Sequence, residues 1–191
     1  MKLVFATHNL NKLKEVQSLV GKDIELLSLT DIGCTEDILE DAATIEGNAL
    51  LKANYVKDTY GYDCFADDTG LEVKSLNGAP GVFSARYAGE QKSATDNMNK
   101  LLIKLATHQD RTARFKTVIA FAKAGNKQTF TGICNGQISK EKIGDGGFGY
   151  DPIFLPDGYD ATFAQMAMPL KSKISHRGKA MQKFLDFLSE H

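Results

Sequence analysis

The order of apolar and polar segments in residues 1–30 restricts the fold more than any other feature of this sequence. Residues 3–6 form a short apolar run, which is typical of a buried strand. A polar break at residues 7–9 precedes apolar side chains at helical spacing, which continue to Gly21, a residue type that often ends helices. Residues 24–29 then have the pattern of a second strand. A strand, a loop, a helix and a strand in this order predict an α/β fold.

The rest of the chain continues to alternate between helix and strand patterns. We expect a helix over residues 44–60 that ends at Gly61, and then a strand at 64–66 that stops at 67–70 and resumes at 71–76. A helix around 98–105 precedes a hairpin of residues 113–124 and 127–139, which turns at Gly125 and Asn126. A C-terminal helix is expected around 181–188. No repeat, low-complexity tract or linker divides these segments. The sequence therefore predicts one two-lobed domain spanning residues 1–191, which is long enough to bury a substantial core.

The charge balance and the apolar segments limit the classes of partner. The formal net charge is −1, so the chain lacks the basic excess of proteins that bind polymeric DNA or RNA. No apolar run approaches the length of a transmembrane helix, and the N-terminus lacks the apolar stretch of a signal peptide. We therefore expect a cytoplasmic protein with neither a polymeric nucleic acid nor a membrane as its partner.

The cysteines and histidines lack metal-binding spacing. Cys34, Cys64 and Cys134 are far apart in the sequence, which is typical of buried free thiols in a reducing compartment. The four histidines show no ligand spacing either. A bound metal would therefore be a hard ion held by carboxylates.

The polar break near the N-terminus has the features of a phosphate-binding loop. The strand before it delivers small polar residues and a lysine to the start of a helix, where backbone N–H groups and the helix dipole favour anions. The residues of this loop are Thr7, His8, Asn9, Leu10, Asn11 and Lys12. The alternative is an ordinary capping turn in which Asn11 is the N-cap and Lys12 is solvated. On the second predicted helix, Lys52 falls within the apolar stripe, and an inward-facing lysine requires an anionic partner.

Two adjacent carboxylates, Asp67 and Asp68, follow the apolar residues of the predicted strand at 64–66. Neighbouring side chains of a strand point to opposite faces, so we expect one aspartate to enter a cleft and the other to be structural. The acidic segment at residues 39–41 could supply a second carboxylate, and two carboxylates from different loops form a hard-cation site that can neutralise a triphosphate. The alternative is a turn in which Asp68 caps its own backbone.

Residues 144–149 match the pattern GxGxxG, but they neither follow a buried strand nor open a helix, and Pro152 follows closely. A dinucleotide-binding site is therefore not expected. A glycine-rich loop that carries Phe148 and Tyr150 suits a mobile edge on which a nucleotide base stacks. The alternative is a flexible surface loop with one aromatic side chain in the core.

The segment at residues 171–179 is basic and precedes an amphipathic helix. Cations at a helix N-terminus oppose the helix dipole, which favours a bound anion as compensation. The alternative is a solvated run of charges. No GxSxG motif frames a nucleophilic serine, so we expect water to be the nucleophile of any hydrolysis.

Six segments, in order along nearly the whole chain, resemble the inosine/xanthosine triphosphate pyrophosphatase family. They are Ala6-Thr7-His8-Asn9 with Lys12 and Glu15; Gly47-Asn48-Ala49 with Lys52; Ala66-Asp67-Asp68-Thr69-Gly70-Leu71; Gly78-Ala79-Pro80-Gly81 with Ser84-Ala85-Arg86-Tyr87; Gly146-Gly147-Phe148-Gly149-Tyr150-Asp151-Pro152; and Lys171 with Ser175-His176-Arg177-Gly178. The chain departs from the family pattern in three places, with Thr69 where serine is frequent, Asn11 where glycine is frequent, and Gly47 where many members carry a glutamate.

The resemblance implies a fold and an activity. The implied fold is mixed α/β, with a long central twisted sheet flanked by helices and with two lobes that have the active-site groove between them. The implied oligomeric state is a homodimer. The implied activity is hydrolysis of ITP, dITP and XTP to the nucleoside monophosphate and pyrophosphate, which keeps these nucleotides out of DNA and RNA. The implied cofactor is Mg²⁺, with Mn²⁺ as a substitute.

The resemblance also implies roles for single residues. Asp68 would be catalytic, and Glu40 and Asp68 would hold the metal. The substrate-binding residues would be Thr7, His8, Asn9, Leu10, Asn11, Lys12, Lys52, Thr69, Phe148, Gly149, Tyr150, Asp151, Lys171, His176 and Arg177. Asp68 would deprotonate a water, directly or through the metal, for in-line attack on the α-phosphorus. Two alternatives stay open: a pyrophosphatase for another modified nucleotide, and a nucleotide sensor without catalysis.

Overall fold

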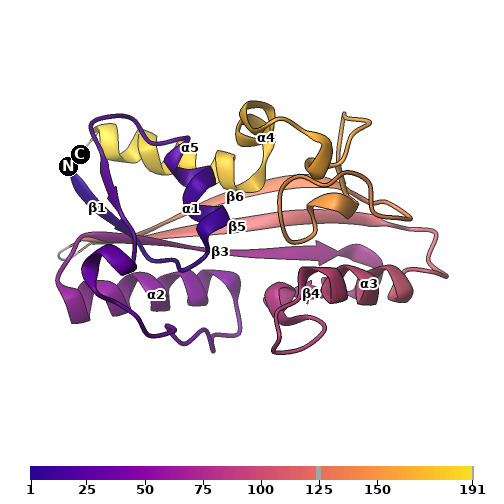
Figure 1. The fold of residues 1–191 in the computed structure, drawn as a ribbon, viewed down its shortest axis with the longest axis horizontal. Coiled ribbons are helices and arrows are strands. Elements are labelled where there is room, and N and C mark those ends of the chain that lie inside the picture. The colour runs from indigo at the N-terminus through magenta and orange to yellow at the C-terminus, as the bar shows by residue number, and fades with distance from the viewer. Residues whose placement is uncertain (124–125, 191) are drawn as a thin grey trace. The chain divides into compact units, whose positions relative to one another are not determined.

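The computed structural model describes residues 1–123 and 126–190, and it confirms the predicted opening of the chain (Figure 1). Strand β1 (Lys2–Phe5), helix α1 (Leu10–Gln17) and strand β2 (Glu25–Leu27) follow one another. The predicted end of α1 at Gly21 was too late. The helix ends at Gln17 with Ser18 as its C-cap, and the N–H of Leu19 bonds to the carbonyl of Val16, three residues earlier, which tightens the last turn.

Within the described residues, seven strands form one mixed sheet in the order β2-β1-β3-β5-β6-β7, with β4 paired to β3. The additional strands are β3 (Cys64–Val73), β4 (Pro80–Gly81), β5 (Thr112–Lys123), β6 (Asn126–Ile138) and β7 (Phe154–Pro156). β1 pairs in parallel with β2 and β3, whereas β4 and β7 pair antiparallel with β3 and β6. Both strands of the predicted hairpin are therefore present as neighbours β5 and β6, and Gly125 of its predicted turn lies outside the described residues.

Strand β3 corrects the prediction that the chain leaves the sheet at residues 67–70. The strand runs without interruption through both aspartates to Val73, and it is buried along most of its length. Adjacent carboxylates in a buried strand are costly unless each has a cationic partner. Here the partners come from helices that are distant in sequence, so the local pattern could not reveal them.

The helices that follow α1 are α2 (Ile45–Tyr60), α3 (Ala94–Lys104), α4 (Met168–Ile174) and α5 (His176–Glu190). α2 confirms the predicted helix at 44–60. The Thr44 hydroxyl caps its N-terminus by accepting from the N–H of Gly47, and Gly61 ends the helix in the left-handed conformation at φ 78°. The helices predicted around 98–105 and 181–188 are α3 and the greater part of α5.

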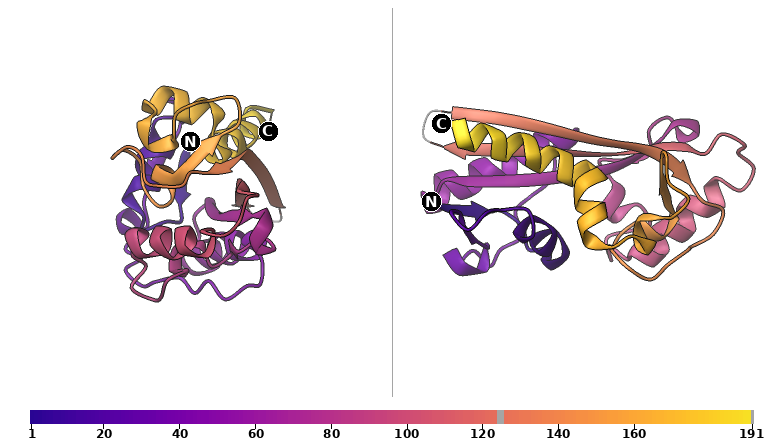
Figure 2. Two further views of the ribbon diagram at one scale, coloured as in Figure 1. Left: turned by 90° about the vertical axis from the view of Figure 1, so that its right-hand side faces the viewer. Right: turned by 90° about the horizontal axis from the view of Figure 1, so that it is seen from above.

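The chain divides into two compact units. Unit 1 comprises Met1–Asp68, Thr117–Gly132 and Arg177–His191, and unit 2 comprises Thr69–Lys116 and Ile133–His176. In unit 1, Figure 1 shows α1 and α5 on one face of the sheet and α2 on the other. Figure 2 shows α5 lying along β5 and β6, where Phe184 packs 5.3 Å from Phe121 and 5.0 Å from Phe65 between ring centroids.

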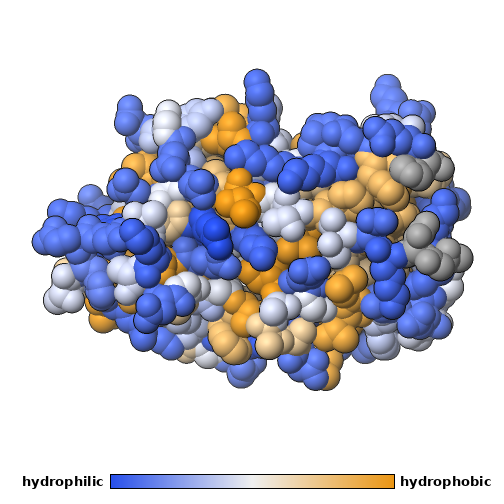
Figure 3. Space-filling view, turned by 180° about the vertical axis from the view of Figure 1, so that it is seen from behind, coloured by the Kyte–Doolittle hydropathy of each residue, from blue (hydrophilic) through white to orange (hydrophobic). Residues whose placement is uncertain are grey.

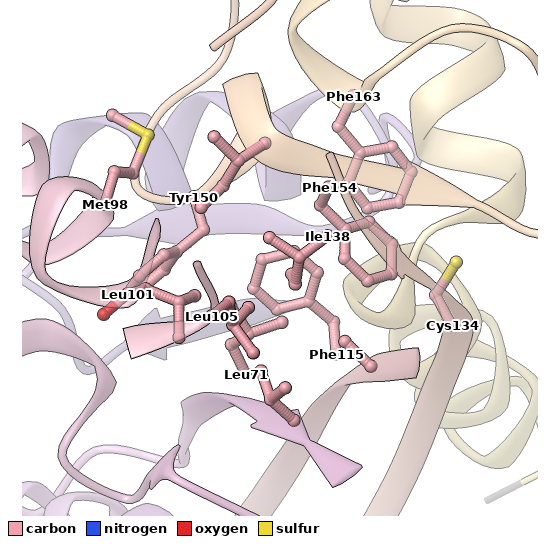
Figure 4. Close-up of a cluster of buried hydrophobic side chains, with 13 residues drawn as sticks. Leu71, Met98, Leu101, Leu105, Phe115, Cys134, Ile138, Tyr150, Phe154 and Phe163 are labelled. Atoms are coloured by element: carbon pink, nitrogen blue, oxygen red, sulfur yellow. The ribbon is translucent and has the colours of Figure 1, made fainter. Parts of the chain in front are cut away.

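Each unit has its own hydrophobic core. The core of unit 1 joins β1, β3, β5 and α5, and the rings of Phe5 and Phe65 stack there at 4.6 Å. The core of unit 2 contains Phe115, Phe154 and Phe163, and it also holds the ring of Tyr150 among leucines of α3 (Figure 4). Cys34, Cys64 and Cys134 are buried free thiols, as predicted.

Figure 3 shows one face of the molecule, on which apolar side chains lie among hydrophilic ones. The most exposed large apolar residues are Ile103, Leu39 and Leu10. In residues 1–123 and 126–190, every helix is too short or too polar to cross a membrane.

Candidate functional site

The two aspartates of β3 face different surroundings because successive side chains of a strand point to opposite faces. Asp67 pairs with Lys12 of α1 and Arg177 of α5, which lie on one face of the sheet in unit 1 (Figure 1). Asp68 pairs with Lys52 of α2 on the other face. One strand thus supplies one carboxylate to each of two charged clusters.

The first cluster is a buried chain of ion pairs. Asp67 Oδ1 accepts from Lys12 Nζ at 2.8 Å, and Asp67 Oδ2 accepts from Arg177 Nε at 2.9 Å. Arg177 Nη1 also donates to Glu15 Oε2 at 2.5 Å. Asp67 is 1% exposed and Arg177 is 2% exposed, so solvent screens these charges weakly.

The charges of this cluster determine its protonation states. Burial alone would raise the pKa of Asp67, but the positive charges of Lys12 and Arg177 outweigh it and hold this pKa well below the ordinary value. Burial alone would lower the pKa of Arg177, and Asp67 and Glu15 raise it instead. Burial lowers the pKa of Lys12, and Asp67 only partly offsets this effect. Asp67 is therefore a fixed anion that holds two cations in place.

The second cluster places one lysine between two carboxylates. Lys52 Nζ donates to Glu40 and lies 3.6 Å from Asp68 Oδ1. Lys52 is 6% exposed, which confirms the prediction from helical phase that this lysine faces inward and meets anions. Burial raises the pKa of Asp68, Lys52 and Lys12 lower it, and the negative charge of Glu40 raises it again, so the net shift is upward. Asp68 is thus a stronger base than a solvated aspartate.

The second cluster fits a hard divalent cation. Among the described residues, Asp68 Oδ2 is buried and has no hydrogen-bond partner, so one carboxylate oxygen is available to a ligand. No group of three or more His, Cys, Asp or Glu residues in the described chain is arranged around a common metal position. Mg²⁺ in proteins is usually held by one or two carboxylates and completes its coordination with waters and substrate phosphates. Glu40 and Asp68, which face the same lysine, match that donor set.

The segment from Thr7 to Lys12 forms a turn and the first residues of α1. Asn9 is the N-cap, and its Oδ1 accepts from the N–H groups of Asn11 at 3.0 Å and Lys12 at 3.2 Å. The alternative with Asn11 as N-cap and Lys12 in water was therefore wrong, since the helix begins two residues earlier and Lys12 is drawn to Asp67. His8 to Asn11, Leu10 included, are exposed, so the positive end of the helix dipole is accessible to anions.

Most of the other predicted substrate-binding residues lie in unit 2, around a further buried ion pair. Lys171 Nζ lies 2.6 Å from Asp151 Oδ2, and each side chain is 5% exposed. Asp151 Oδ2 also accepts from the backbone N–H of Phe148 at 2.7 Å, and Lys171 Nζ lies 5.1 Å from the centroid of the Phe148 ring. A Cβ on Gly147 would lie 2.0 Å from the same carboxylate oxygen, so this position requires glycine.

The two aromatic residues of the glycine-rich loop have different environments. The hydroxyl of Tyr150 donates to the carbonyl of Ser84 at 2.8 Å, and its ring belongs to the core of unit 2 (Figure 4). Phe148 is half-buried. Gly149, between these two residues, adopts a φ of 62°. Outside this loop, the predicted substrate-binding residue Thr69 lies at the start of unit 2 and is half-buried. Phe148 is therefore the aromatic side chain of this loop that retains an accessible surface.

His176 and Arg177 are adjacent in sequence but have different partners. The ring of His176 stacks on Phe115 at 4.4 Å in unit 2, whereas Arg177 belongs to the Asp67 cluster of unit 1. Lys171 and Arg177 are buried, so a fully solvated run of charges at 171–179 was wrong. The anions that compensate Arg177 are the carboxylates of Glu15 and Asp67.

The structure places Lys12, Lys52 and Asp68 together in unit 1, and the sequence analysis missed the ion pair that Glu15 forms there with Arg177. The signal was present: Glu15 follows Lys12 by three residues, which places both side chains on the same side of α1. Its partner is 162 residues away, so no local pattern could identify it.

Comparisons with known proteins match the chain over nearly its whole length. The model of the Ham1 family matches residues 3–187. The chain is 62% identical over 190 residues to the dITP/XTP pyrophosphatase of Christiangramia forsetii, with full coverage of both chains, and 59% identical to that of Flavobacterium johnsoniae, with 99% and 98% coverage. The solved Ham1 protein of Staphylococcus aureus superposes with a TM-score of 0.90 at 38% identity, covering 100% of this chain and 99% of that one. The HAM1 protein of Coxiella burnetii gives 0.91 at 36% identity, with full coverage of both.

Proposed function

Because the chain belongs to the Ham1 family, we propose that it is a nucleoside-triphosphate pyrophosphatase that hydrolyses dITP, ITP and XTP to the nucleoside monophosphate and pyrophosphate. The observation that carries this proposal is the pair of carboxylates, Glu40 and Asp68, on either side of the buried Lys52. A polyphosphate needs cations, and a hydrolase needs a base near the reacting phosphorus. This cluster supplies a lysine and two carboxylates that can hold a hard metal, of which Asp68 is the proposed base.

The charge balance of the two clusters favours a divalent cation as part of the active enzyme. The four carboxylates of the two clusters exceed their three cations by one negative charge. A triphosphate would be repelled by such a site without additional positive charge. When bound, Mg²⁺ would be held by Glu40 and Asp68, where it would offset phosphate charge and acidify a water.

The proposed reaction is attack of a water oxygen on the α-phosphorus. The Asp68 carboxylate orients this water and accepts its proton while the new P–O bond forms. The bond between the α-phosphorus and the bridging oxygen breaks, and pyrophosphate leaves with that electron pair. Lys12 and Lys52 stabilise the negative charge on the departing pyrophosphate, and the exposed start of α1 presents the positive end of its helix dipole to the phosphates.

The residues of unit 2 are assigned to the nucleoside. We assign Phe148 to the face of the purine and the Lys171–Asp151 pair to polar contacts with the nucleotide, because these side chains adjoin one another. Tyr150 and His176 support them from the core. Hydrogen-bond donors that pair with the 6-oxo group of the purine would be left unpaired by a 6-amino group. Each unpaired donor costs about 1–3 kcal/mol of binding free energy. Two or more donors are needed to exclude ATP.

The resemblance further favours a homodimer and a cytoplasmic location, and both are part of the proposal. A second candidate function is hydrolysis of another modified nucleotide, and a third is nucleotide sensing without turnover. The names of the relatives favour the purine pyrophosphatase over both.

Product analysis tests the proposed function. The purified chain is incubated with ITP, dITP, XTP, GTP or dTTP in Mg²⁺, in Mn²⁺ and in EDTA, and nucleoside monophosphate and pyrophosphate are quantified. We expect equimolar products from the first three nucleotides, with kcat/KM at least tenfold above that for GTP and dTTP, and none in EDTA. A preference for dTTP would overturn the purine assignment. Tight binding of ITP without pyrophosphate release would support a sensor instead.

A further inference from the structure

The proposed metal ligand Glu40 lies on a segment that needs external support. Residues 34–43 lie within the described chain and form neither helix nor strand. The Glu40 side chain is 33% exposed, in contrast to 8% for its partner Lys52. A carboxylate on such a segment binds a cation well only if the backbone that carries it is already fixed.

The C-terminal end of this segment is fixed at the start of α2. The backbone N–H of Ala42 donates to Asn48 Oδ1 at 3.0 Å, and Asn48 is 1% exposed. Gly47 lets the segment come close to the helix, because a Cβ there would lie 2.7 Å from the Cβ of Ala42.

The N-terminal end is fixed by one carboxylate, that of Glu36. Its Oε1 accepts from the hydroxyl of Tyr55 at 2.6 Å and from that of Tyr60 at 2.8 Å, and both tyrosines belong to α2. Its Oε2 accepts from the backbone N–H of Thr35 at 3.1 Å. These hydrogen bonds, those of Tyr55 foremost, lower the pKa of Glu36 to about 2, so the carboxylate is charged at neutral pH.

The same residue connects this segment to the start of α1. The backbone carbonyl of Glu36 lies 3.0 Å from Nε2 of His8, within the predicted phosphate-binding turn. The buried Cys34 lies two residues before Glu36, and its Sγ lies 3.9 Å from the same carbonyl oxygen. Glu36 therefore joins three parts of unit 1: the His8 turn, the segment that carries Glu40, and α2, which carries Lys52.

We propose that Glu36 is a positioning residue, which together with Tyr55 and Tyr60 fixes the backbone that presents Glu40 to Lys52 and to the divalent cation. This inference rests on the proposed function for the role of the cation. When these hydrogen bonds are lost, the segment becomes less ordered, and binding of the cation must supply the order that the fold no longer provides. The affinity for the cation then falls, while turnover at saturating cation changes little because the bound cation restores the arrangement.

The test uses the double variant Tyr55→Phe/Tyr60→Phe, which removes both hydroxyls and leaves the segment and its charges unchanged. Glu36→Gln is the second variant, and Tyr62→Phe is the matched control because Tyr62 is an exposed tyrosine just after α2. Three quantities are measured: amide hydrogen exchange of residues 34–43, the Kd of Mn²⁺ in the presence of pyrophosphate by electron paramagnetic resonance, and the Mg²⁺ concentration for half-maximal pyrophosphate release from ITP.

For the double variant we expect exchange at least tenfold faster in residues 34–43 and about fivefold weaker Mn²⁺ binding. We also expect about fivefold more Mg²⁺ for half-maximal release and a kcat within twofold at saturating Mg²⁺. Glu36→Gln should change the same quantities in the same direction, and Tyr62→Phe should change none of them. Unchanged exchange, or faster exchange with unchanged Mn²⁺ affinity, would overturn the inference. If the unaltered chain fails to hydrolyse ITP, the proposed function falls, while exchange and Mn²⁺ binding still decide the role of Glu36.

Discussion

Replacing Arg177 with methionine removes the cation that two buried carboxylates share. Asp67 and Glu15 are 1% and 6% exposed, and both accept from this guanidinium. Methionine retains much of the side-chain volume, so the main loss is electrostatic. Removing one partner of a buried ion pair typically costs about 3–5 kcal/mol, because the other charge stays buried. Lys12 remains beside Asp67, which places the expected loss for Arg177→Met near the lower end of that range.

This loss converts into a measurable shift of the melting temperature. For a chain of 191 residues, 1 kcal/mol corresponds to roughly 2–4 °C, so Arg177→Met should lower Tm by about 6–12 °C in calorimetry at pH 7. Arg114→Met is the matched control. Its partner is Glu72, and the Arg114 side chain is 51% exposed, so its pair should contribute less than about 1 kcal/mol.

The loss of stability caused by Arg177→Met depends on pH in a defined direction. Because the pKa of Asp67 is held below its ordinary value of about 3.9, its pairing stabilises the fold at neutral pH, and this stabilisation is lost as acid protonates the carboxylate. The difference in unfolding free energy between the unaltered chain and Arg177→Met should therefore shrink below about pH 4. Adding Glu15→Gln to Arg177→Met should recover part of the loss, since it removes one of the buried charges.

Two results would refute this reasoning. One is a loss of stability for Arg177→Met no larger than that for Arg114→Met, and the other is a difference that grows on acidification. Unchanged stability together with an altered preference between ITP and GTP would instead assign Arg177 to substrate binding, as the resemblance implied.

Three further substitutions test other parts of the proposed site. Asp68→Asn should lower kcat by about a thousandfold and preserve the fold by circular dichroism, because it removes the proposed base; near-normal turnover would remove Asp68 from that role. Phe148→Ala should raise KM for ITP more than it lowers kcat, since stacking acts in the ground and transition states alike, and an unchanged KM would make the ring merely structural. Gly47→Ala should lower the melting temperature, because the new Cβ would lie 2.7 Å from that of Ala42. Helix propensity alone predicts instead that the unfolding free energy rises by about 1 kcal/mol, and this result would show that residues 34–43 move aside freely.

Features set by local spacing were predictable from the sequence. The first strand, helix and strand follow from apolar periodicity, and the inward direction of Lys52 follows from its phase on α2. The start of α1 was misplaced by two residues in the capping alternative, because Asn9 and Asn11 are equally good N-caps by residue type.

Features that depend on distant partners were not predictable. The aspartates of β3 have the local pattern of a turn, and the strand continues only because α1, α2 and α5 bring cations to it. The partner of Glu15 is 162 residues away, and Glu36 meets tyrosines 19 and 24 residues later. Such contacts arise from tertiary packing, which a single sequence does not encode in any local period.

The central claim, attack of water on the α-phosphorus, is tested most directly by hydrolysis of ITP in water enriched in oxygen-18. Mass spectrometry of both products then locates the bond that was broken. The account predicts one labelled oxygen in inosine monophosphate and none in the pyrophosphate released. Label in pyrophosphate would mean attack on the β-phosphorus, and label in free phosphate would mean removal of the γ-phosphate alone; either result would contradict the assigned role of Asp68.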